Sequence, residues 1–415
     1  MHMIVFDYFN TKHVWRLLGG SLISKFGDGL AEMLFVVLAY QLSGSDPAGV
    51  GVAYGLRFLP YLLLGPLSAK VSSHYPRRAI LIWCDTIRLV LACCFAFTLW
   101  TGNLSFSALV FYGASVTTIR AFSTPAFFTA LRDYSVEKGD LPKINSINQM
   151  FTESGMIVGP AIGGYLLYIG VEEFLLVLLD ALTFLISLIF IAPLPRKEGG
   201  KAFEQGERVI SIKAAIVEYY KNLALERRTP GQKAAVYSGA LIVFVGGVIS
   251  VVLPGLALEI VKEDHGIATA MTLLGIGAIL GSFLSGKGKT WTLRALLCCW
   301  ALYGLSILFI GVLPSQAHLF YLSCLTLGGL GGVVDVAIPS VIQLNSSSDT
   351  TPVNFATFST LANISDSMSG FLVAIVAGFI ALNSIPIVFG AATFLIALGL
   401  LAAEGQFIKA TSEHR

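Results

Sequence analysis

Residues 173–193 read EFLLVLLDALTFLISLIFIAP, and after the first position this stretch contains a single charged residue, Asp180. A helix of about 20 apolar residues is long enough to cross the hydrocarbon core of a bilayer. The stretch lacks the ten-residue alternation of apolar and polar side chains that is typical of membrane β-barrels. It therefore predicts a transmembrane helix.

The composition of the whole chain agrees with this prediction. Of 415 residues, 55% are hydrophobic and 13% are charged, and the mean hydropathy is +0.77. A soluble protein carries roughly 25% charged residues, so lipid must cover most of this surface. Backbone groups inside lipid must pair within their own segment, which long apolar runs achieve as helices. We expect an all-α membrane protein with about twelve transmembrane helices.

Hydropathy windows of about 19 residues divide the chain into two six-helix halves. The longest polar segment, 195–233, is the expected cytoplasmic linker between an N-terminal half, 1–194, and a C-terminal half, 234–415. The expected helices are 17–42, 47–69, 79–99, 105–127, 145–168 and 173–193 in the first half, and 234–258, 267–286, 291–313, 317–342, 355–380 and 383–403 in the second.

Basic residues predict the orientation. Most of the 27 Lys and Arg residues fall on the side that carries both termini and the linker, whereas only Lys262 falls on the opposite side. The positive-inside rule then predicts cytoplasmic N- and C-termini. Residues 1–9 are too short for a cleavable signal peptide, so we expect the first span to act as its own insertion signal.

Sequence motifs for other chemistry are lacking. The histidines do not have metal-ligand spacing, and the sequence contains no G-x-x-x-x-G-K-S/T phosphate loop, so neither a metal nor ATP is expected. We expect no cofactor, no enzymatic activity and no nucleic-acid partner. The six cysteines are interpreted as small packing residues: Cys84, Cys93, Cys94, Cys298, Cys299 and Cys324.

Three charged residues share one face of the first span. Lys25, Asp28 and Glu32 are spaced i, i+3 and i+7. Each costs about 2.5–3.5 kcal/mol in mid-bilayer unless it lines a cavity or has a partner. One interpretation is a proton- or substrate-binding face, in which neighbouring carboxylates repel and bind protons more readily. The alternative is a Lys25–Asp28 ion pair, with Glu32 held by a polar neighbour.

Four further charges in the first half suggest partners. Arg57 lies halfway along the second span, where it could meet an acid of the first span in a substrate or coupling role. Asp85 and Arg88 are spaced i, i+3 and suggest an intrahelical ion pair, joined to the preceding loop, or a part in gating. Arg120 is the candidate counter-ion of Glu153, a structural role.

The remaining acids inside spans are Asp180, Asp335 and Asp366. Asp366 lies in the polar stretch 363–369 and is expected to face the central cavity or the other half. Asp335 follows a glycine-rich turn nearer the cytoplasmic end, which suggests a gating or structural charge. Asp180 is interpreted as a hydrogen-bond acceptor in helix packing.

Several segments together resemble the major facilitator superfamily, and within it the branch of the enterobactin exporter and the macrolide-efflux-like proteins. The matching segments are Gly27-Asp28, Arg57-Phe-Leu-Pro60, Arg77-Arg78, Asp85-Thr-Ile-Arg88, Thr124-Pro125-Ala126, 141–148, and the residues Gly155, Gly159, Pro160, Gly163 and Gly164 of an antiporter-like pattern G-x-x-x-G-P-x-x-G-G. The resemblance implies the two-half fold, small-molecule transport across a bacterial inner membrane, and an antiport mechanism.

The sequence also departs from that family. The family's loop between spans two and three reads G-x-L-A-D-R-x-x-R-R, whereas this chain has Ala69, Ser73 and His74 where Gly, Asp and Arg are expected. Since that Asp helps to latch the two halves together, the resemblance implies a weakened or rebuilt latch. An arginine common early in the fourth span, and basic residues common before the eleventh, are also missing.

These observations favour a secondary transporter: proton-driven efflux of a siderophore, antibiotic or other small organic molecule, by a monomer that alternates its access. An uptake symporter using the same acids remains the main alternative. A lipid scramblase or a membrane enzyme is less favoured, because the sequence shows no nucleophile or metal constellation. A channel is disfavoured because the charges form no repeated ring.

Overall fold

The computed structural model describes residues 12–43, 47–135, 137–195, 230–261, 266–287, 291–312, 316–348, 350–376 and 379–412. Within these ranges the chain forms long helices, one short 3-10 helix (η1, Lys138–Asp140) and no strand. The predicted linker, 195–233, lies outside the described residues over 196–229. The long helices are α2 (Lys12–Leu42), α3 (Pro47–His74), α4 (Arg77–Trp100), α5 (Phe106–Tyr134), α6 (Leu141–Tyr168), α7 (Glu173–Ile191), α10 (Pro230–Val261), α11 (Gly266–Ser285), α12 (Leu293–Val312), α13 (Ala317–Leu344), α14 (Thr351–Val376) and α15 (Ser384–Ser412).

Twelve long helices in the described residues confirm the predicted fold class. Their bounds differ from the predicted spans mainly at polar ends: α5 continues to Tyr134 rather than 127, and α14 begins at Thr351 rather than 355. Hydropathy detects only the apolar part of a helix, whereas helical hydrogen bonding continues into polar residues.

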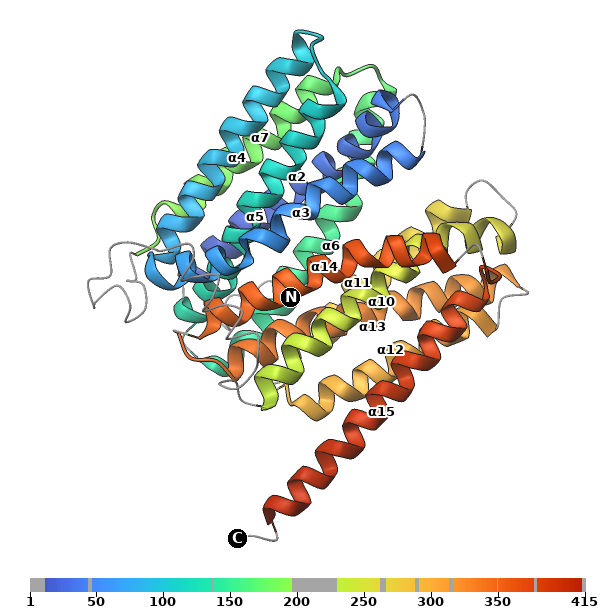
Figure 1. The fold of residues 1–415 in the computed structure, drawn as a ribbon. Coiled ribbons are helices and arrows are strands. Elements are labelled where there is room, and N and C mark those ends of the chain that lie inside the picture. The colour runs from blue at the N-terminus through green and yellow to red at the C-terminus, as the bar shows by residue number, and fades with distance from the viewer. Residues whose placement is uncertain are drawn as a thin grey trace.

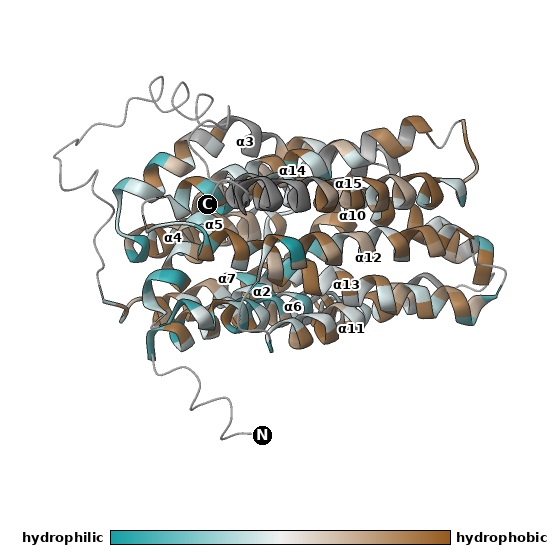
Figure 2. Cartoon of the chain, turned by 90° about the horizontal axis from the view of Figure 1, so that it is seen from below, coloured by the Kyte–Doolittle hydropathy of each residue, from teal (hydrophilic) through white to brown (hydrophobic). Residues whose placement is uncertain are grey.

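Six of the described helices are long and apolar enough by composition alone to cross a membrane: Arg77–Trp100, Glu173–Ile191, Val236–Val261, Leu293–Val312, Ala317–Leu344 and Ser384–Ala402. Helices such as α2 and α6 fall short of that criterion because they carry charged and amide side chains that lie inside the protein. Large apolar side chains are exposed on the outside instead; Phe111 on α5, for example, is 70% exposed. Hydrophobic residues colour long stretches of the helices in Figure 2. This is the surface expected of a protein solvated by lipid.

Two helical bundles make up the molecule (Figure 1). In the N-terminal half, α2 packs against α5, α6 and α7, and α4 packs against α5 and α7. In the C-terminal half, α10 packs against α13 and α14, α11 against α13, and α12 against α15. We call the face at which α2 begins and α7 ends the terminal face, and the other one the opposite face.

The halves meet through two groups of helices. The helix α14 contacts α3 and α5, and α6 contacts α11 and α13. In Figure 1 the bundles converge where α14 approaches α3 and α5, and their axes diverge away from the terminal face. The charged face of α2 therefore lies in a half that is joined to its partner mainly at one end.

Glycines place α6 directly against this face of α2. A Cβ on Gly155 would lie 2.5 Å from the backbone carbonyl of Lys25, and one on Gly159 would lie 2.7 Å from the backbone of Phe26 and Leu30. Small residues let membrane helices approach to backbone contact. Gly163 and Gly164 are different. A Cβ on Gly163 would lie too close only to the flexible end of the Met33 side chain, and a Cβ on Gly164 would meet nothing within 4 Å. Within this motif, Gly155 and Gly159 therefore make the helix contact.

Candidate functional site

The site is built around Asp28, which lies near the middle of α2. Its carboxylate accepts a short hydrogen bond from Arg88 of α4 and lies 3.4 Å from Lys25 Nζ and 3.9 Å from Arg120 Nη2 of α5. We call Lys25, Asp28, Arg88 and Arg120 the Asp28 cluster. The side chain of Asp28 is 10% exposed, so three cations compensate one nearly buried carboxylate.

Arg88 connects this cluster to two more helices. Its guanidinium lies 4.2 Å from the ring centre of Phe184 on α7, and its Nη1 lies 3.9 Å from Asp85 Oδ1. The predicted intrahelical pair therefore exists, but the closer partner of Arg88 is Asp28. Asp85 accepts a hydrogen bond of 2.8 Å from Ser187 of α7. We expected this ion pair to be joined to the loop before α4. That expectation is wrong, because the residue that bonds to Asp85 is Ser187 of α7.

A second ion pair joins α2 to α3. Arg57 Nη2 lies 2.8 Å from Glu32 Oε2, and Arg57 Nε donates to Thr117 Oγ1 at 3.4 Å. The guanidinium also lies 4.7 Å from the ring centre of Phe35. The prediction that Arg57 meets an acid of the first span is confirmed. Asp28 and Glu32 thus have separate cations, rather than the mutual repulsion considered from their spacing.

Glu153 has a different partner from the one predicted. It accepts a hydrogen bond of 2.7 Å from Gln149, and the same amide lies 3.3 Å from Asp335 of the other half. Arg120 pairs with Asp28 instead. The predicted Arg120–Glu153 pair is therefore wrong: both residues are on neighbouring helices, but α5 directs Arg120 toward α2. Gln149 bridges two acids, one from each half.

Asp366 of α14 is exposed and lies within electrostatic reach of Glu32 in the other half. This position agrees with the expectation that it faces the other half. Asp335 is also exposed, and it accepts a hydrogen bond from Gln149 of the N-terminal half.

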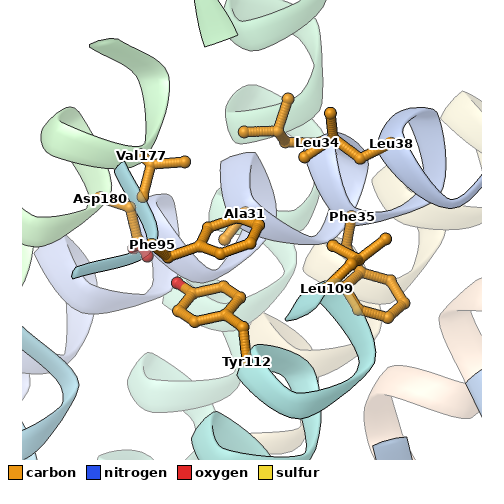
Figure 3. Close-up of a pocket in the computed structure, with 9 residues that line it drawn as sticks. All are labelled: Ala31, Leu34, Phe35, Leu38, Phe95, Leu109, Tyr112, Val177 and Asp180. Atoms are coloured by element: carbon orange, nitrogen blue, oxygen red, sulfur yellow. The ribbon is translucent and has the colours of Figure 1, made fainter. Parts of the chain in front are cut away.

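Asp180 has the predicted packing role only in part, because Thr183 of its own helix is its one hydrogen-bonding neighbour among the described residues. Its backbone carbonyl accepts from Thr183, but its side-chain Oδ1 has no hydrogen-bond partner among the described residues. The carboxylate lies beside a small cavity within the N-terminal half (Figure 3). Spacing within α7 could not reveal this, because the cavity is formed by four helices.

The halves are joined at the terminal face by a set of contacts that we call the latch. Arg77 Nε lies 3.5 Å from Asp133 Oδ2, and Arg77 Nη2 donates to the carbonyl of Ser348 at 3.2 Å. Ser348 Oγ donates to Asp133 in turn. Arg132 donates to the carbonyls of Gln343 and Ser346 at 3.2 and 2.7 Å.

The expectation of a rebuilt latch agrees with this geometry. Ser73 and His74, which replace the family's acid and base, bond to carbonyls of their own helix. Asp133, at the end of α5, supplies the carboxylate instead. Sequence reasoning missed Asp133 because it ended the fourth span at 127, seven residues short of the end of α5 at Tyr134.

Buried amides strengthen the same contact. Asn145 Nδ2 donates to Gln343 Oε1 at 2.7 Å and to Ser340 Oγ at 2.9 Å, and Gln343 Nε2 donates to the carbonyl of Phe128 at 2.9 Å. Phe128 stacks on Phe355 with ring centres 4.6 Å apart. Among the described residues, the hydrogen bonds between the halves lie between the terminal face and the depth of the Gln149–Asp335 contact. These hydrogen bonds close the protein at the terminal face.

This arrangement defines a class: a membrane-spanning protein of two helical bundles, with ionisable groups at mid-depth and a closed contact at one face. Sequence comparison then gives the family. The model of the Major Facilitator Superfamily matches residues 17–370, and the chain belongs to this family of transporters.

Relatives agree with that membership. The chain is 26% identical over 350 residues to the uncharacterised MFS-type transporter YkuC of Bacillus subtilis, covering 80% of this chain and 78% of the relative. It is 24% identical over 323 residues to macrolide efflux protein A of Streptococcus pyogenes, covering 76% and 77%.

Solved structures share the fold. The human organic anion transporter MFSD10 superposes with a TM-score of 0.77 at 13% identity, over 94% of this chain and 100% of that one. A bacterial homologue of the iron transporter ferroportin in an outward-facing state superposes with a TM-score of 0.73 at 14% identity, over 95% and 100%.

Proposed function

We propose that the protein is a proton-driven exporter of a small organic molecule in a bacterial inner membrane. The halves rock about a site at mid-depth and expose it to the two sides of the membrane in turn. The observation that carries the proposal is the pairing of a mid-depth ionisable face on α2 with a latch whose hydrogen bonds, among the described residues, lie toward one face. Transport by alternating access needs both features.

The distribution of basic residues supports a cytoplasmic terminal face. The described structure is then the outward-facing state, with the latch closed toward the cytosol. This state releases an exported substrate. Proton uptake by Asp28 then requires that its three cations move away, because in the described contacts they hold the carboxylate ionised.

Asp28 is the proposed coupling acid. Protonation would neutralise the carboxylate and leave Arg88 and Lys25 without their shared partner, so the contacts of α2 with α4 would rearrange. Protonation from outside favours release of the substrate, and deprotonation toward the cytosol favours loading. A proton gradient directed inward then drives export.

The groups between the halves suit an organic substrate that carries charge. Glu32, which is 23% exposed and paired with Arg57, and Asp366 of the other half supply these groups. The relatedness to macrolide efflux protein A supports a drug-like compound, although one fold serves many solutes. A siderophore is the other proposed substrate, from the resemblance to the enterobactin exporter.

Everted membrane vesicles test direction and coupling together. An acidic lumen should drive accumulation of a fluorescent macrolide, and a protonophore should abolish it. Asp28→Asn should remove accumulation while the protein remains in the membrane at wild-type level. Wild-type accumulation by Asp28→Asn contradicts the coupling role.

The alternatives give different results in the same assay. Accumulation in right-side-out vesicles with acid outside would indicate an uptake symporter. Movement of labelled lipid without any gradient would indicate a scramblase.

A further inference from the structure

Asp180 is a carboxylic acid in the interior of the N-terminal half. It lies in the middle of α7 and is 2% exposed. Its Oδ1 has no hydrogen-bond partner among the described residues. A buried carboxylate that lacks a partner carries a penalty of several kcal/mol when it is ionised, and such a group neutralises itself instead. Burial and the orphaned oxygen together favour a bound proton.

A cavity gives this acid access to water. It has a volume of about 10 Å³, which is the lower limit for one water molecule. Figure 3 shows Asp180 on one side of it and the hydroxyl of Tyr112 directed toward the same side. A buried water needs two or more polar partners, and these two groups supply them. The other lining residues are apolar, among them Leu38, Phe95 and Leu109.

The position of the cavity separates it from the space between the halves. Its walls come from α2, α4, α5 and α7, all in the N-terminal half. Leu38 lies near the end of α2 at the opposite face, and Leu109 lies near the beginning of α5 at the same face. The cavity thus lies inside one bundle, on the side of Asp180 that is nearer the opposite face.

Arg88 offers Asp180 a second state. Its Nε is a buried donor without a hydrogen-bond partner among the described residues, while its other nitrogens contact Asp28 and Asp85. Asp180 and Arg88 lie within electrostatic reach of each other. Gly27 permits the approach of α7, because a Cβ there would lie 2.4 Å from Asp180 Oδ1. An acceptor without a partner, Asp180 Oδ1, and a donor without a partner, Arg88 Nε, therefore lie near each other among the described residues.

We propose that Asp180 is a second proton-binding site, which exchanges its proton with water in the cavity beside Tyr112 rather than with the space between the halves. The proton passes from a water in the cavity to Asp180 Oδ1 and returns by the same route. When Asp180 releases it, the carboxylate accepts from Arg88 Nε and weakens the hold of Arg88 on Asp28. As a coupling step, this switch rests on the proposed function.

The charged and titratable groups that face Asp180 fit such a switch. They are Asp28 from α2, Arg88 with its neighbour Asp85 from α4, and Tyr112 from α5. Of these only Arg88 is a cation. When Asp180 is protonated, Arg88 compensates the charges of two carboxylates, Asp28 and Asp85. When Asp180 is ionised, Arg88 must compensate three. The charge on Asp180 therefore controls how strongly Arg88 binds Asp28.

Infrared spectroscopy of the full chain in detergent tests the site directly. A protonated carboxylic acid has a carbonyl stretch that a carboxylate lacks. One such band should be lost in Asp180→Asn and kept in Thr129→Val, which changes a buried side chain of α5 that hydrogen-bonds to the carbonyl of Pro125 in its own helix. If Asp180→Asn keeps every carboxylic-acid carbonyl band of the wild-type protein, the proposal is overturned.

Deuterium exchange of this band tests the route, and it remains informative if Asp180→Asn fails to fold. Tyr112→Phe should keep the band but slow its shift in deuterium oxide by about tenfold, which corresponds to a barrier about 1.4 kcal/mol higher. Tyr165→Phe, on a side chain that is 62% exposed, is the matched control and should exchange at the wild-type rate. An unchanged rate in Tyr112→Phe overturns the route through the cavity.

The two proposals fail in distinguishable ways. If the wild-type protein shows no gradient-driven transport, the proposed function fails, while the band and its exchange still report on Asp180. If transport is proton-driven but Asp180→Asn transports with the wild-type pH dependence, Asp28 couples alone and the switch is overturned.

Discussion

At the residue scale, the charges that the sequence places along the helices form a network of ion pairs, and its two arginines at Asp28 differ in burial and in the number of acids they contact. Arg88 is buried and serves Asp28 and Asp85 together, whereas Arg120 is 34% exposed and lies 3.9 Å from the same carboxylate. Removing one partner of a buried ion pair leaves an uncompensated charge, which costs far more than losing an exposed pair. The two arginines therefore differ in importance although both contact Asp28.

This difference predicts unequal effects of the same substitution. Arg88→Gln should destabilise the protein by about 3–5 kcal/mol, because Asp28 and Asp85 lose their shared cation. Arg120→Gln should cost less than about 1 kcal/mol. Denaturant unfolding of the purified proteins in detergent measures both. Equal effects of the two substitutions would contradict the network as described.

Sequence reasoning reached part of this network. The spacing of Lys25, Asp28 and Glu32 predicts a shared helix face, and the pairing of Arg57 with that face follows from its depth. The choice among several acids for each arginine could not be predicted, since it depends on how α4, α5 and α7 are rotated about their axes. Arg120 and Asp180 show this most clearly.

At the element scale, the antiporter-like motif acts in this structure as a helix contact. Gly155 and Gly159 bring the backbone of α6 against α2 beside Lys25 and Asp28. Any side chain there would push α2 away and move its charged face. Backbone atoms cannot yield as the end of a flexible side chain can.

The motif therefore predicts that Gly→Ala substitutions affect stability and transport to different degrees at its different positions. Gly159→Ala should lower the melting temperature and reduce transport, because its Cβ would lie 2.7 Å from the α2 backbone. Gly164→Ala is the matched control, because a Cβ there meets nothing within 4 Å, and it should resemble wild type. Thermal unfolding in detergent and vesicle transport provide the measurements. A stable, active Gly159→Ala protein would show that α6 is free to shift.

At the scale of the whole molecule, the latch at the terminal face holds the described state. Arg132, Asn145 and Gln343 form hydrogen bonds across the halves, and several of these atoms are buried. Losing a buried hydrogen bond costs about 1–3 kcal/mol. A free-energy change of this size alters the equilibrium constant between the closed and open forms of this face by about 5- to 150-fold.

Gln343→Ala should accordingly shift the protein toward the form that is open at the terminal face. Double electron–electron resonance between spin labels on the two halves would show longer distances at that face. Arg78→Gln is a suitable control, because Arg78 bonds to the carbonyl of Ala192 within the N-terminal half. Its distances should match wild type. Unchanged distances in Gln343→Ala would mean that other contacts hold the latch.

The sequence by itself determined that the chain folds as helices in lipid, that it has two halves of six, and that α2 carries an ionisable face. These follow from local properties: the length of apolar runs, their periodicity and the cost of burying charge. Only the tertiary structure decided which cation serves which acid, which residues form the latch and that Asp180 lies beside a cavity. Each of these depends on contacts between helices far apart in the sequence, whose rotation and separation are set by packing rather than by hydropathy.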